Sequence, residues 1–313
     1  MSIQHHGKYW FLLGGMTIGL GLYVGVCLII LDVLITPQMI HTYRLPIELG
    51  FVGAKTLNFE SASDGITLRG WIVPTNEKKQ VVVLIHGIHG YAWDCQAPDY
   101  VKAYNKAGID VFLFDLRGHG RSEGEHLGLG LTERGDVRAA IDTLLERGYK
   151  PGHIGLHGSS YGASVALLAA AQIGEVGAVV ADSAYATVID VVGGELERRT
   201  GLPSGLAVLF QPGLNFLALL KYSLDIDKSA PEDAIGEISP RPILLIHGIE
   251  DTIIPHENAH RLKAAAGPAT ELWLIPGDHI EGVRLNMSCG DESPTNQDFL
   301  RKVTRFFTNN LGG

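Results

Sequence analysis

Short, continuous hydrophobic runs recur through most of the chain, with helix-favouring segments between them. The runs do not alternate between polar and apolar positions, so both faces of each predicted strand should be buried, as in a parallel sheet covered by helices. Six such strands are predicted at 81–86, 110–115, 153–158, 177–182, 242–247 and 271–276. Helices are predicted at about 96–107, 133–147, 161–173, 256–266 and 294–310. Together they predict an α/β fold with a doubly wound, mostly parallel sheet.

Two segments depart from this alternation. Residues 55–74 predict a β-hairpin, because two β-favouring runs flank Asp64-Gly65, a strong turn pair. The interval from about 185 to 238 contains no predicted strand, and a structureless loop of that length is unusual in a compact domain. We therefore expect a small helical cap there, over the carboxyl edge of the sheet. Its apolar stretch 206–224 either forms a lid over a substrate pocket or faces the core.

The N-terminus is uniformly apolar. The run from Tyr9 to Leu31 carries no charge, and as a helix it would reach about 34 Å, enough to cross a hydrocarbon core of roughly 30 Å. A cleaved signal peptide would have a shorter apolar core ending at small residues, and neither feature is present. We predict a single transmembrane anchor over 9–36, a linker over 37–55 and a main domain over 56–313.

Flanking charges give a weak indication of orientation. Lys8 and the amino terminus lie on one side of the apolar run, and Asp32 and Arg44 lie on the other. Because cytoplasmic flanks tend to be positive, this favours a cytoplasmic N-terminus, with the main domain on the non-cytoplasmic side of the membrane.

Composition excludes several classes of protein. Of the 313 residues, 46% are hydrophobic and 19% charged, which is typical of a folded protein and not of a disordered one. The formal net charge of −9 argues against nucleic acid as a partner, since that would require a basic face. The three cysteines are Cys27, Cys95 and Cys289. They form no C-x-x-C pair, and without a disulfide framework we favour separate thiols at Cys95 and Cys289. The alternative is a disulfide between these two residues, which would require the fold to bring them together.

The segment 153–171 places a serine between a strand and a helix. Gly158-Ser159-Ser160-Tyr161-Gly162 is a G-x-S-x-G motif, in which a sharp turn exposes the hydroxyl of the central serine above the sheet. Only Ser160 has glycines two residues away on both sides, so it is the predicted nucleophile. The backbone N–H of Tyr161, at the start of the helix, can donate to a developing oxyanion.

To act as a nucleophile, a serine hydroxyl needs a histidine base and an acid that orients the histidine. In this kind of site both follow the serine along the chain, the acid first and the histidine second. Asp251 follows the predicted strand 242–247, and His279 follows the strand 271–276, so both lie on loops at the same sheet edge. Glu250 and Asp278 are the alternative acids.

A second oxyanion donor is expected in the loop after the first predicted strand. In His86-Gly87-Ile88-His89-Gly90 the glycine permits tight curvature, and the N–H of Ile88 is the expected donor, with that of His89 the second choice. His89 is also an alternative base, although it precedes the serine in chain order.

These motifs carry a family resemblance. "HGIHG", "DLRGHGRSEG" (115–124), "GSSYG", "HGIEDTIIP" and "GDH" resemble those of the α/β-hydrolase superfamily, in particular its esterase, thioesterase and serine-aminopeptidase-like branches. Over residues 56–310 the resemblance implies Ser160 as nucleophile, Asp251 as acid, His279 as base, and oxyanion donors at Ile88 and Tyr161. It also implies that "DLRGHGRS" is a structural loop. The expected activity is hydrolysis of an ester or thioester of an acyl or lipid-like substrate without a cofactor, and an amide or peptide is the alternative substrate.

Three other interpretations compete with this one. His256-Glu257-Asn258-Ala259-His260 satisfies H-E-x-x-H, a zinc-hydrolase pattern, and Glu281 could be a third ligand. However, His256 lies in the first turn of the predicted helix, and zinc would leave the serine motif unexplained. The spacing of "RGHGRSEG" misses that of a phosphate-binding G-x-G-x-x-G loop. A non-catalytic binding protein on the same fold is the third alternative.

Overall fold

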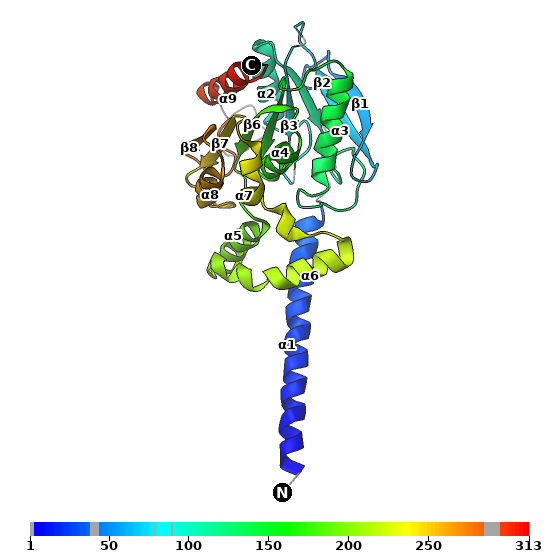
Figure 1. Ribbon diagram of the computed structural model, residues 1–313, viewed down its shortest axis with the longest axis vertical. Helices are drawn as coiled ribbons and strands as arrows, with labels where there is room; N and C mark the ends of the chain where they lie inside the picture. Colours follow the sequence, from blue (N-terminus) through cyan, green and yellow to red (C-terminus); the bar gives the residue numbers. More distant parts are fainter. Residues whose placement is uncertain (1–2, 38–43, 78, 89, 285–294, 313) are drawn as a thin grey trace.

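The computed structural model describes residues 3–37, 44–77, 79–88, 90–284 and 295–312, with residues 3–13 as backbone alone. Its centre is an eight-stranded sheet with the order β1-β2-β4-β3-β5-β6-β7-β8 (Figure 1). The strands are β1 (Lys55–Glu60), β2 (Thr67–Val73), β3 (Val81–Ile85), β4 (Asp110–Phe114), β5 (Ile154–Ser159), β6 (Val176–Asp182), β7 (Ile243–Gly248) and β8 (Thr270–Ile275).

Strand directions confirm the predicted α/β fold. β3 pairs in parallel with β4 and β5, and β5 to β8 continue in parallel. β1 and β2 form the expected antiparallel hairpin, in which Gly65 has a φ of 75°. The hairpin joins the sheet through the antiparallel pairing of β2 with β4. Since strand order depends on long-range pairing, the sequence predicted the strands but not this order.

Helices cover both faces of the sheet, so the strands are buried on both sides, as their uninterrupted apolar runs require. Val83 and Ile85 of β3 belong to a core shared with α3 (Glu133–Glu146), α4 (Tyr161–Gln172) and α8 (Glu257–Ala265). Val82 and Leu84 face a second core, shared with α2 (Ala97–Lys106) and α9 (Gln297–Asn310). The two cores fix the strand ends from which the candidate site is built.

The predicted helical cap follows β6. It consists of α5 (Val188–Thr200), the 3₁₀ helix η1 (Ser204–Leu209), α6 (Gln211–Tyr222), η2 (Ile226–Ser229), α7 (Pro231–Ala234) and η3 (Ile235–Ile238). Thr187 and Asp190 form a capping box that starts α5, and Gly201, in the left-handed region, ends it. In Figure 1, α5 and α6 lie at the end of the domain from which the N-terminal helix leaves.

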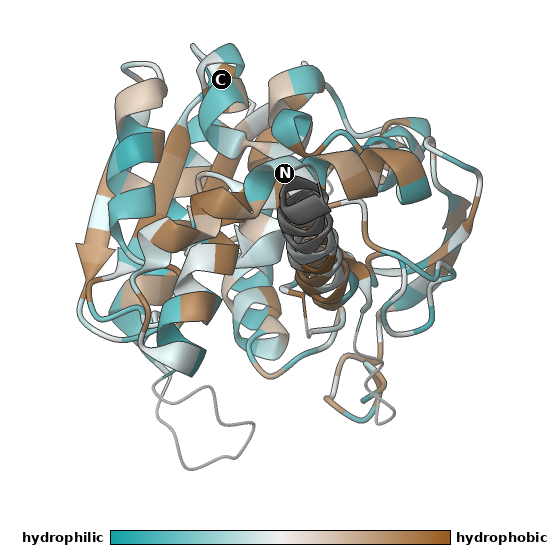
Figure 2. Ribbon diagram, turned by 90° about the horizontal axis from the view of Figure 1, so that it is seen from below, coloured by the Kyte–Doolittle hydropathy of each residue, from teal (hydrophilic) through white to brown (hydrophobic). Residues whose placement is uncertain are grey.

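The N-terminal helix α1 (Ile3–Ile35) contains one candidate membrane span, Gly14–Ile35, with a mean hydropathy of 2.6. Its last turns are not free of the domain. Cys27, Leu31 and Ile35 are buried in the core shared with α3 and α4, whereas the preceding turns project as a stalk, seen end-on in Figure 2. Tyr9 and Trp10 lie in the part described as backbone alone.

Within the segment predicted as a linker, Phe51 packs on Trp93, with ring centroids 5.1 Å apart.

One cysteine expectation was wrong. Cys95 is disulfide-bonded, whereas Cys27 is a buried free thiol. Cys289 lies outside the described residues. The error arose because sequence spacing does not show which distant segments the fold brings together.

Candidate active site

The turn between β5 and α4 holds Ser160 in a strained conformation. Ser160 has φ 55° and ψ −123°, a region that non-glycine residues rarely adopt. The flanking glycines are required by close backbone approach. A Cβ at Gly158 would lie 2.1 Å from the carbonyl oxygen of Gly162, and a Cβ at Gly162 would lie 2.2 Å from that of Ile85. The motif is therefore a steric requirement of this turn.

Ser160, His279 and Asp251 form one hydrogen-bonded chain. His279 Nε2 lies 2.8 Å from Ser160 Oγ, and His279 Nδ1 lies 2.7 Å from Asp251 Oδ2. A carboxylate only accepts hydrogen bonds, so Nδ1 is the donor to Asp251, and Nε2 is left to accept from the serine hydroxyl. This geometry can remove a proton from the hydroxyl as it attacks an electrophile. The structure thus brings together the three residues predicted as nucleophile, base and acid.

Asp251 is held as a carboxylate. Burial raises its pKa, but hydrogen bonds from His247 and His279 outweigh this and hold the pKa well below its usual range. Its other oxygen, Oδ1, accepts from the backbone N–H groups of Ile253 and Ile254. A carboxylate fixed in this way orients the imidazole of His279.

The two alternative acids brace the loops instead. Asp278 Oδ1 accepts from the backbone N–H groups of Thr252 and His279, at 2.7 Å in both cases. Glu250 Oε2 accepts from the N–H of Gly277. These contacts tie the loop after β7 to the loop after β8, which keeps Asp251 and His279 in register.

The loop after β3 lies directly beside the serine. A Cβ at Gly87 would be 3.3 Å from Ser160 Cβ and 3.8 Å from Ser160 Oγ, so the next residue, Ile88, is placed near the reacting hydroxyl. Within the described part of the chain the N–H groups of Ile88 and Tyr161 donate no hydrogen bond, which leaves both available to an oxyanion. His89 lies outside the described residues.

The "DLRGHGRS" loop packs against the loop that follows β3. Asp115 accepts from the N–H groups of Ala92 and Arg121, and His119 Nε2 contacts the carbonyl oxygen of Ile88. Arg117, 3% exposed, forms ion pairs with Asp64 and Asp136. These contacts hold the Ile88 carbonyl and with it the expected oxyanion loop.

Three buried groups near the site were not singled out from the sequence. His247 contacts Asp251, and Ser183 Oγ accepts from the N–H of Ile280, the residue after His279. Asp182 at the end of β6 accepts from Ser160 N–H through its carbonyl oxygen. Burial raises the pKa of the Asp182 carboxyl to about 6. In the sequence these three residues are distinguished only by their positions at or near the ends of predicted strands, a feature that they share with many other residues.

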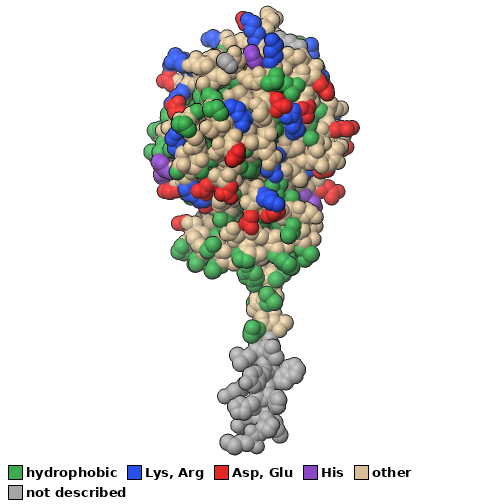
Figure 3. All heavy atoms as spheres, viewed as in Figure 1, with side chains coloured by type: hydrophobic (Ala, Val, Ile, Leu, Met, Phe, Trp, Pro, Cys, Tyr) green, Lys and Arg blue, Asp and Glu red, His purple; other side chains and the backbone are tan. Residues whose placement is uncertain are grey.

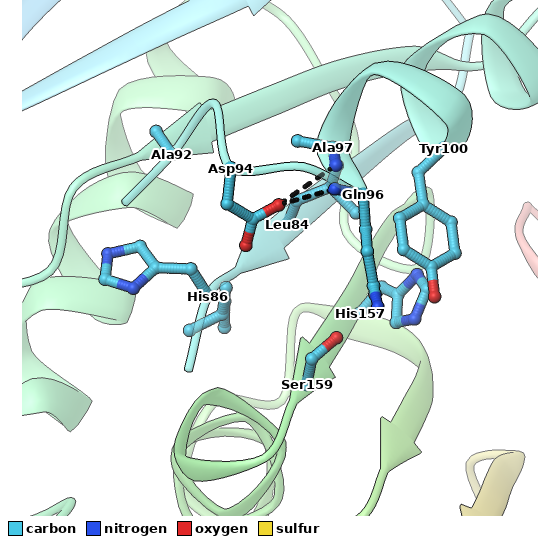
Figure 4. A pocket seen from close by; sticks show the side chains of 10 residues that line it. Leu84, His86, Ala92, Asp94, Gln96, Ala97, Tyr100, His157 and Ser159 are labelled. Carbon is cyan, nitrogen blue, oxygen red and sulfur yellow. Dashed lines mark hydrogen bonds between the residues drawn. The ribbon is translucent and has the colours of Figure 1, made fainter. Parts of the chain in front are cut away.

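A small polar cavity lies behind the serine turn. Its volume of about 30 Å³ is room for about one water molecule, and Figure 4 shows Ser159, Gln96, Tyr100 and His157 around it. The hydroxyl of Tyr100 and Nε2 of His157 are buried and, among the described residues, have no hydrogen-bond partner. The cavity therefore offers polar partners to a small polar molecule.

The zinc pattern does not assemble into a site in the described residues. His256 precedes α8, and its ring centroid lies 5.9 Å from that of His260. Glu281 accepts from the N–H of Asp278 instead. Across residues 14–37, 44–77, 79–88, 90–284 and 295–312, whose side chains the structure describes, no three His, Cys, Asp or Glu side chains are grouped as a metal ion would require.

Comparison with known proteins places this geometry in context. The sequence profile of the alpha/beta hydrolase family matches residues 82–287, which include Ser160, Asp251 and His279. The protein YfhR of Salmonella typhi is 31% identical over 234 residues, which cover 73% of this chain and 75% of YfhR. The polyketide transferase grgF of a Penicillium species is 32% identical over 223 residues, covering 68% of this chain and 63% of grgF.

Among solved structures, the esterase Pf2001 of Pyrococcus furiosus superposes with a TM-score of 0.68. It covers 89% of this chain and 99% of its own, at 22% sequence identity. At that identity the likeness concerns the fold.

Proposed function

The chain belongs to the alpha/beta hydrolase family, and we propose that it is a serine hydrolase of carboxylic esters or thioesters. The observation that carries the proposal is the hydrogen-bonded chain from Ser160 Oγ through His279 to Asp251, at 2.8 Å and 2.7 Å. The chain stands at the carboxyl edge of a parallel sheet, where ligands bind in such folds.

The proposed reaction uses these contacts in two steps. Ser160 Oγ attacks the carbonyl carbon while His279 Nε2 takes its proton, and the N–H groups of Ile88 and Tyr161 donate to the resulting oxyanion. When the intermediate collapses, the bond to the leaving group breaks and His279 returns the proton to that group. Water, deprotonated by His279, then attacks the acyl-serine ester. The bond between the acyl carbon and Ser160 Oγ breaks, His279 returns the proton to Oγ, and the carboxylic acid leaves. Asp251 stabilises the imidazolium throughout, and no cofactor enters either step.

The acyl acceptor and the leaving group distinguish the alternatives. An amide or peptide would react through the same chain of residues, with an amine as leaving group. The relative grgF is called a polyketide transferase, and transfer to an acceptor other than water would need only that the acceptor replace water in the second step.

We also propose that α1 anchors the domain to a membrane, with the domain on the non-cytoplasmic side. The length and hydropathy of Gly14–Ile35 support the anchor. The disulfide at Cys95 supports the side, because disulfides persist outside the reducing cytosol.

Labelling of the full-length protein in detergent with a fluorophosphonate probe tests the nucleophile. We expect Ser160→Ala to abolish labelling and the neighbouring Ser159→Ala to retain it, with a chelator having no effect. Hydrolysis of p-nitrophenyl esters, acyl thioesters and anilides then ranks the leaving groups. Labelling that persists in Ser160→Ala, or that the chelator removes, would refute the proposal.

A further inference from the structure

Helix α6 of the cap shows its apolar side to solvent. Phe216, Leu219 and Leu220 are 65%, 58% and 71% exposed. Its buried side chains, Leu214 and Ala218, are apolar as well, and the half-buried Asn215 donates from Nδ2 to Asp227 Oδ1 at 2.6 Å. A surface helix of a soluble protein instead has one apolar side, which faces the core, and a polar side outward. The outward side of α6 is thus built for an apolar surrounding.

The preceding 3₁₀ helix extends this surface. Leu206, Val208 and Leu209 of η1 are 39%, 56% and 62% exposed. We call these three residues, together with Phe216, Leu219 and Leu220, the cap apolar face. In Figure 3, hydrophobic side chains gather over the lower end of the domain around the stalk, whereas charged side chains lie mostly above them. Apolar area of this extent marks an interaction surface.

The cap is fastened to α1 beside this face. Tyr23 Oη donates to the carbonyl oxygen of Leu209 at 2.9 Å and accepts from the N–H of Gly213 at 3.1 Å. The rings of Tyr23 and Phe210 stack, with centroids 6.1 Å apart. On α1 itself the turns before Tyr23 are exposed and apolar. Met16, Ile18, Leu20 and Leu22 are 64–72% exposed. The cap apolar face and the exposed surface of α1 are therefore continuous.

Helix geometry gives the depth of the face in a bilayer. A hydrocarbon core of roughly 30 Å takes about 20 helical residues at 1.5 Å each. Counted from Tyr9, the first residue after Lys8, such a span ends near Leu28. Tyr23 and Cys27 contact the cap at this level, and the first following charge, Asp32, interacts electrostatically with Lys221 of α6. The cap apolar face thus falls at the boundary between acyl chains and headgroups.

We propose that the cap apolar face lies in the boundary layer of the bilayer that α1 crosses, so that the carboxyl edge of the sheet is turned toward the lipid. The inference rests on the proposed function for its anchor. The occupant is a lipid surface and not a second copy of the chain, because the face is continuous with the surface of α1 that the acyl chains surround. Substrates are accordingly membrane-resident esters or thioesters that carry a long acyl chain.

Depth-dependent fluorescence quenching tests the position of the face. NBD is attached to Phe216→Cys or Leu220→Cys in the full chain, reconstituted in phosphatidylcholine vesicles with doxyl-labelled lipid. The reference is Arg147→Cys, exposed at the end of α3 remote from α1 (Figure 1), and wild-type protein gives the labelling background. We expect quenching at 216 and 220 several-fold stronger than at 147, and stronger with doxyl at acyl carbon 5 than at carbon 12.

Quenching at 216 and 220 no stronger than at 147 would overturn the proposal. So would NBD emission that is blue-shifted, insensitive to doxyl lipid and dependent on the protein-to-lipid ratio, because this pattern identifies a second copy as the cover.

A second measurement separates the face from the chemistry. The double variant Phe216→Ser/Leu220→Ser should hydrolyse a short soluble ester at the wild-type rate, but a long-chain ester in vesicles roughly five-fold more slowly or worse, because it loses apolar insertion. Val52→Ser, at a position 79% exposed outside the cap, should change neither rate. Equal rates on the vesicle ester would refute the interfacial role. A wild-type protein inactive on both esters would refute the proposed function and leave the quenching result to decide the face.

Discussion

His247 Nε2 lies 3.2 Å from Asp251 Oδ2, the same oxygen that faces His279. The carboxylate is therefore shared between two histidines. His247 is 1% exposed at the end of β7, and its Nε2 also lies 2.8 Å from the carbonyl oxygen of Ile254. A proton on Nε2 satisfies both acceptors, so His247 orients Asp251 as Asp251 orients His279.

Replacement of His247 by Phe should therefore slow the reaction without weakening substrate binding. Loss of a hydrogen bond to a charged group corresponds to about 1.5–3 kcal/mol, so kcat should fall by roughly ten- to a hundred-fold with KM little changed. The pKa of Asp251 should rise, so the acid limb of the pH–rate profile should move to higher pH. His247→Gln, which keeps a donor, should recover part of the rate. An unchanged profile in His247→Phe would show that the contact has no such role.

A methyl group at Gly158 should disrupt the serine turn. Its Cβ would lie 2.1 Å from the carbonyl oxygen of Gly162, a backbone atom that cannot move aside easily. We expect Gly158→Ala to lower the free energy of unfolding by about 3 kcal/mol and to abolish fluorophosphonate labelling. The control is Gly174→Ala, where a Cβ would meet nothing within 4 Å. Urea unfolding in detergent measures both, and equal stability of the two variants would contradict the steric argument.

Removal of the Arg117 guanidinium should leave buried carboxylates unpaired. Asp136 and Glu133 are fully buried beside it, and their ion pairs with Arg117 have N–O distances of 2.6 and 4.0 Å. Arg117→Met should destabilise the fold by about 3–5 kcal/mol, since a buried charge without its partner is costly. Arg198→Met, which breaks an exposed pair with Glu195, should leave the unfolding midpoint nearly unchanged. Similar midpoints for both variants would refute the prediction.

Asp182 should make stability fall as the pH rises. Burial raises its pKa to about 6, above the ordinary 3.8, and its Oδ2 has no hydrogen-bond partner among the described residues. Its contribution is thus fully present below pH 4 and is lost as the pH rises through 6, by up to about 3 kcal/mol for two pKa units.

Asp182→Asn should accordingly have a flatter dependence of unfolding free energy on pH between 4 and 7. The slope should decrease and not vanish, because burial also raises the pKa of Asp115 to about 6. An unchanged slope would show that a group other than Asp182 causes the pH dependence of the unfolding free energy.

Where local pattern determines structure, the sequence was sufficient. The predicted strand 110–115 and helix 133–147 match β4 and α3 to within one residue, because buried runs and helix-favouring segments are local signals. The predicted serine, acid and histidine are brought together because each follows a parallel strand, and such strands end at one edge.

The sequence was insufficient where partners are distant. The second contact of Asp251 comes from His247 inside a strand, a position that periodicity marks only as buried. Arg117 forms an ion pair with Asp64, which lies more than fifty positions earlier in the chain. The apolar stretch 206–224 remained ambiguous, because both the inward and the outward sides of α6 are apolar, and the sequence orients a helix by the contrast between its two sides.

The packing of α1 has a consequence for the order in which the protein is completed during synthesis. Leu31 and Ile35 are made before α3 and α4, which belong to the core that covers them, and the N–H that bonds the Ile35 carbonyl belongs to Leu127. Leu209 and Gly213, the hydrogen-bond partners of Tyr23, are synthesised later still. These turns of α1 are thus made before the segments that complete their packing, and such long-range closure slows folding. Removal of the whole helix from the finished protein would uncover core side chains, so the last turns of α1 are part of the domain that the stalk carries.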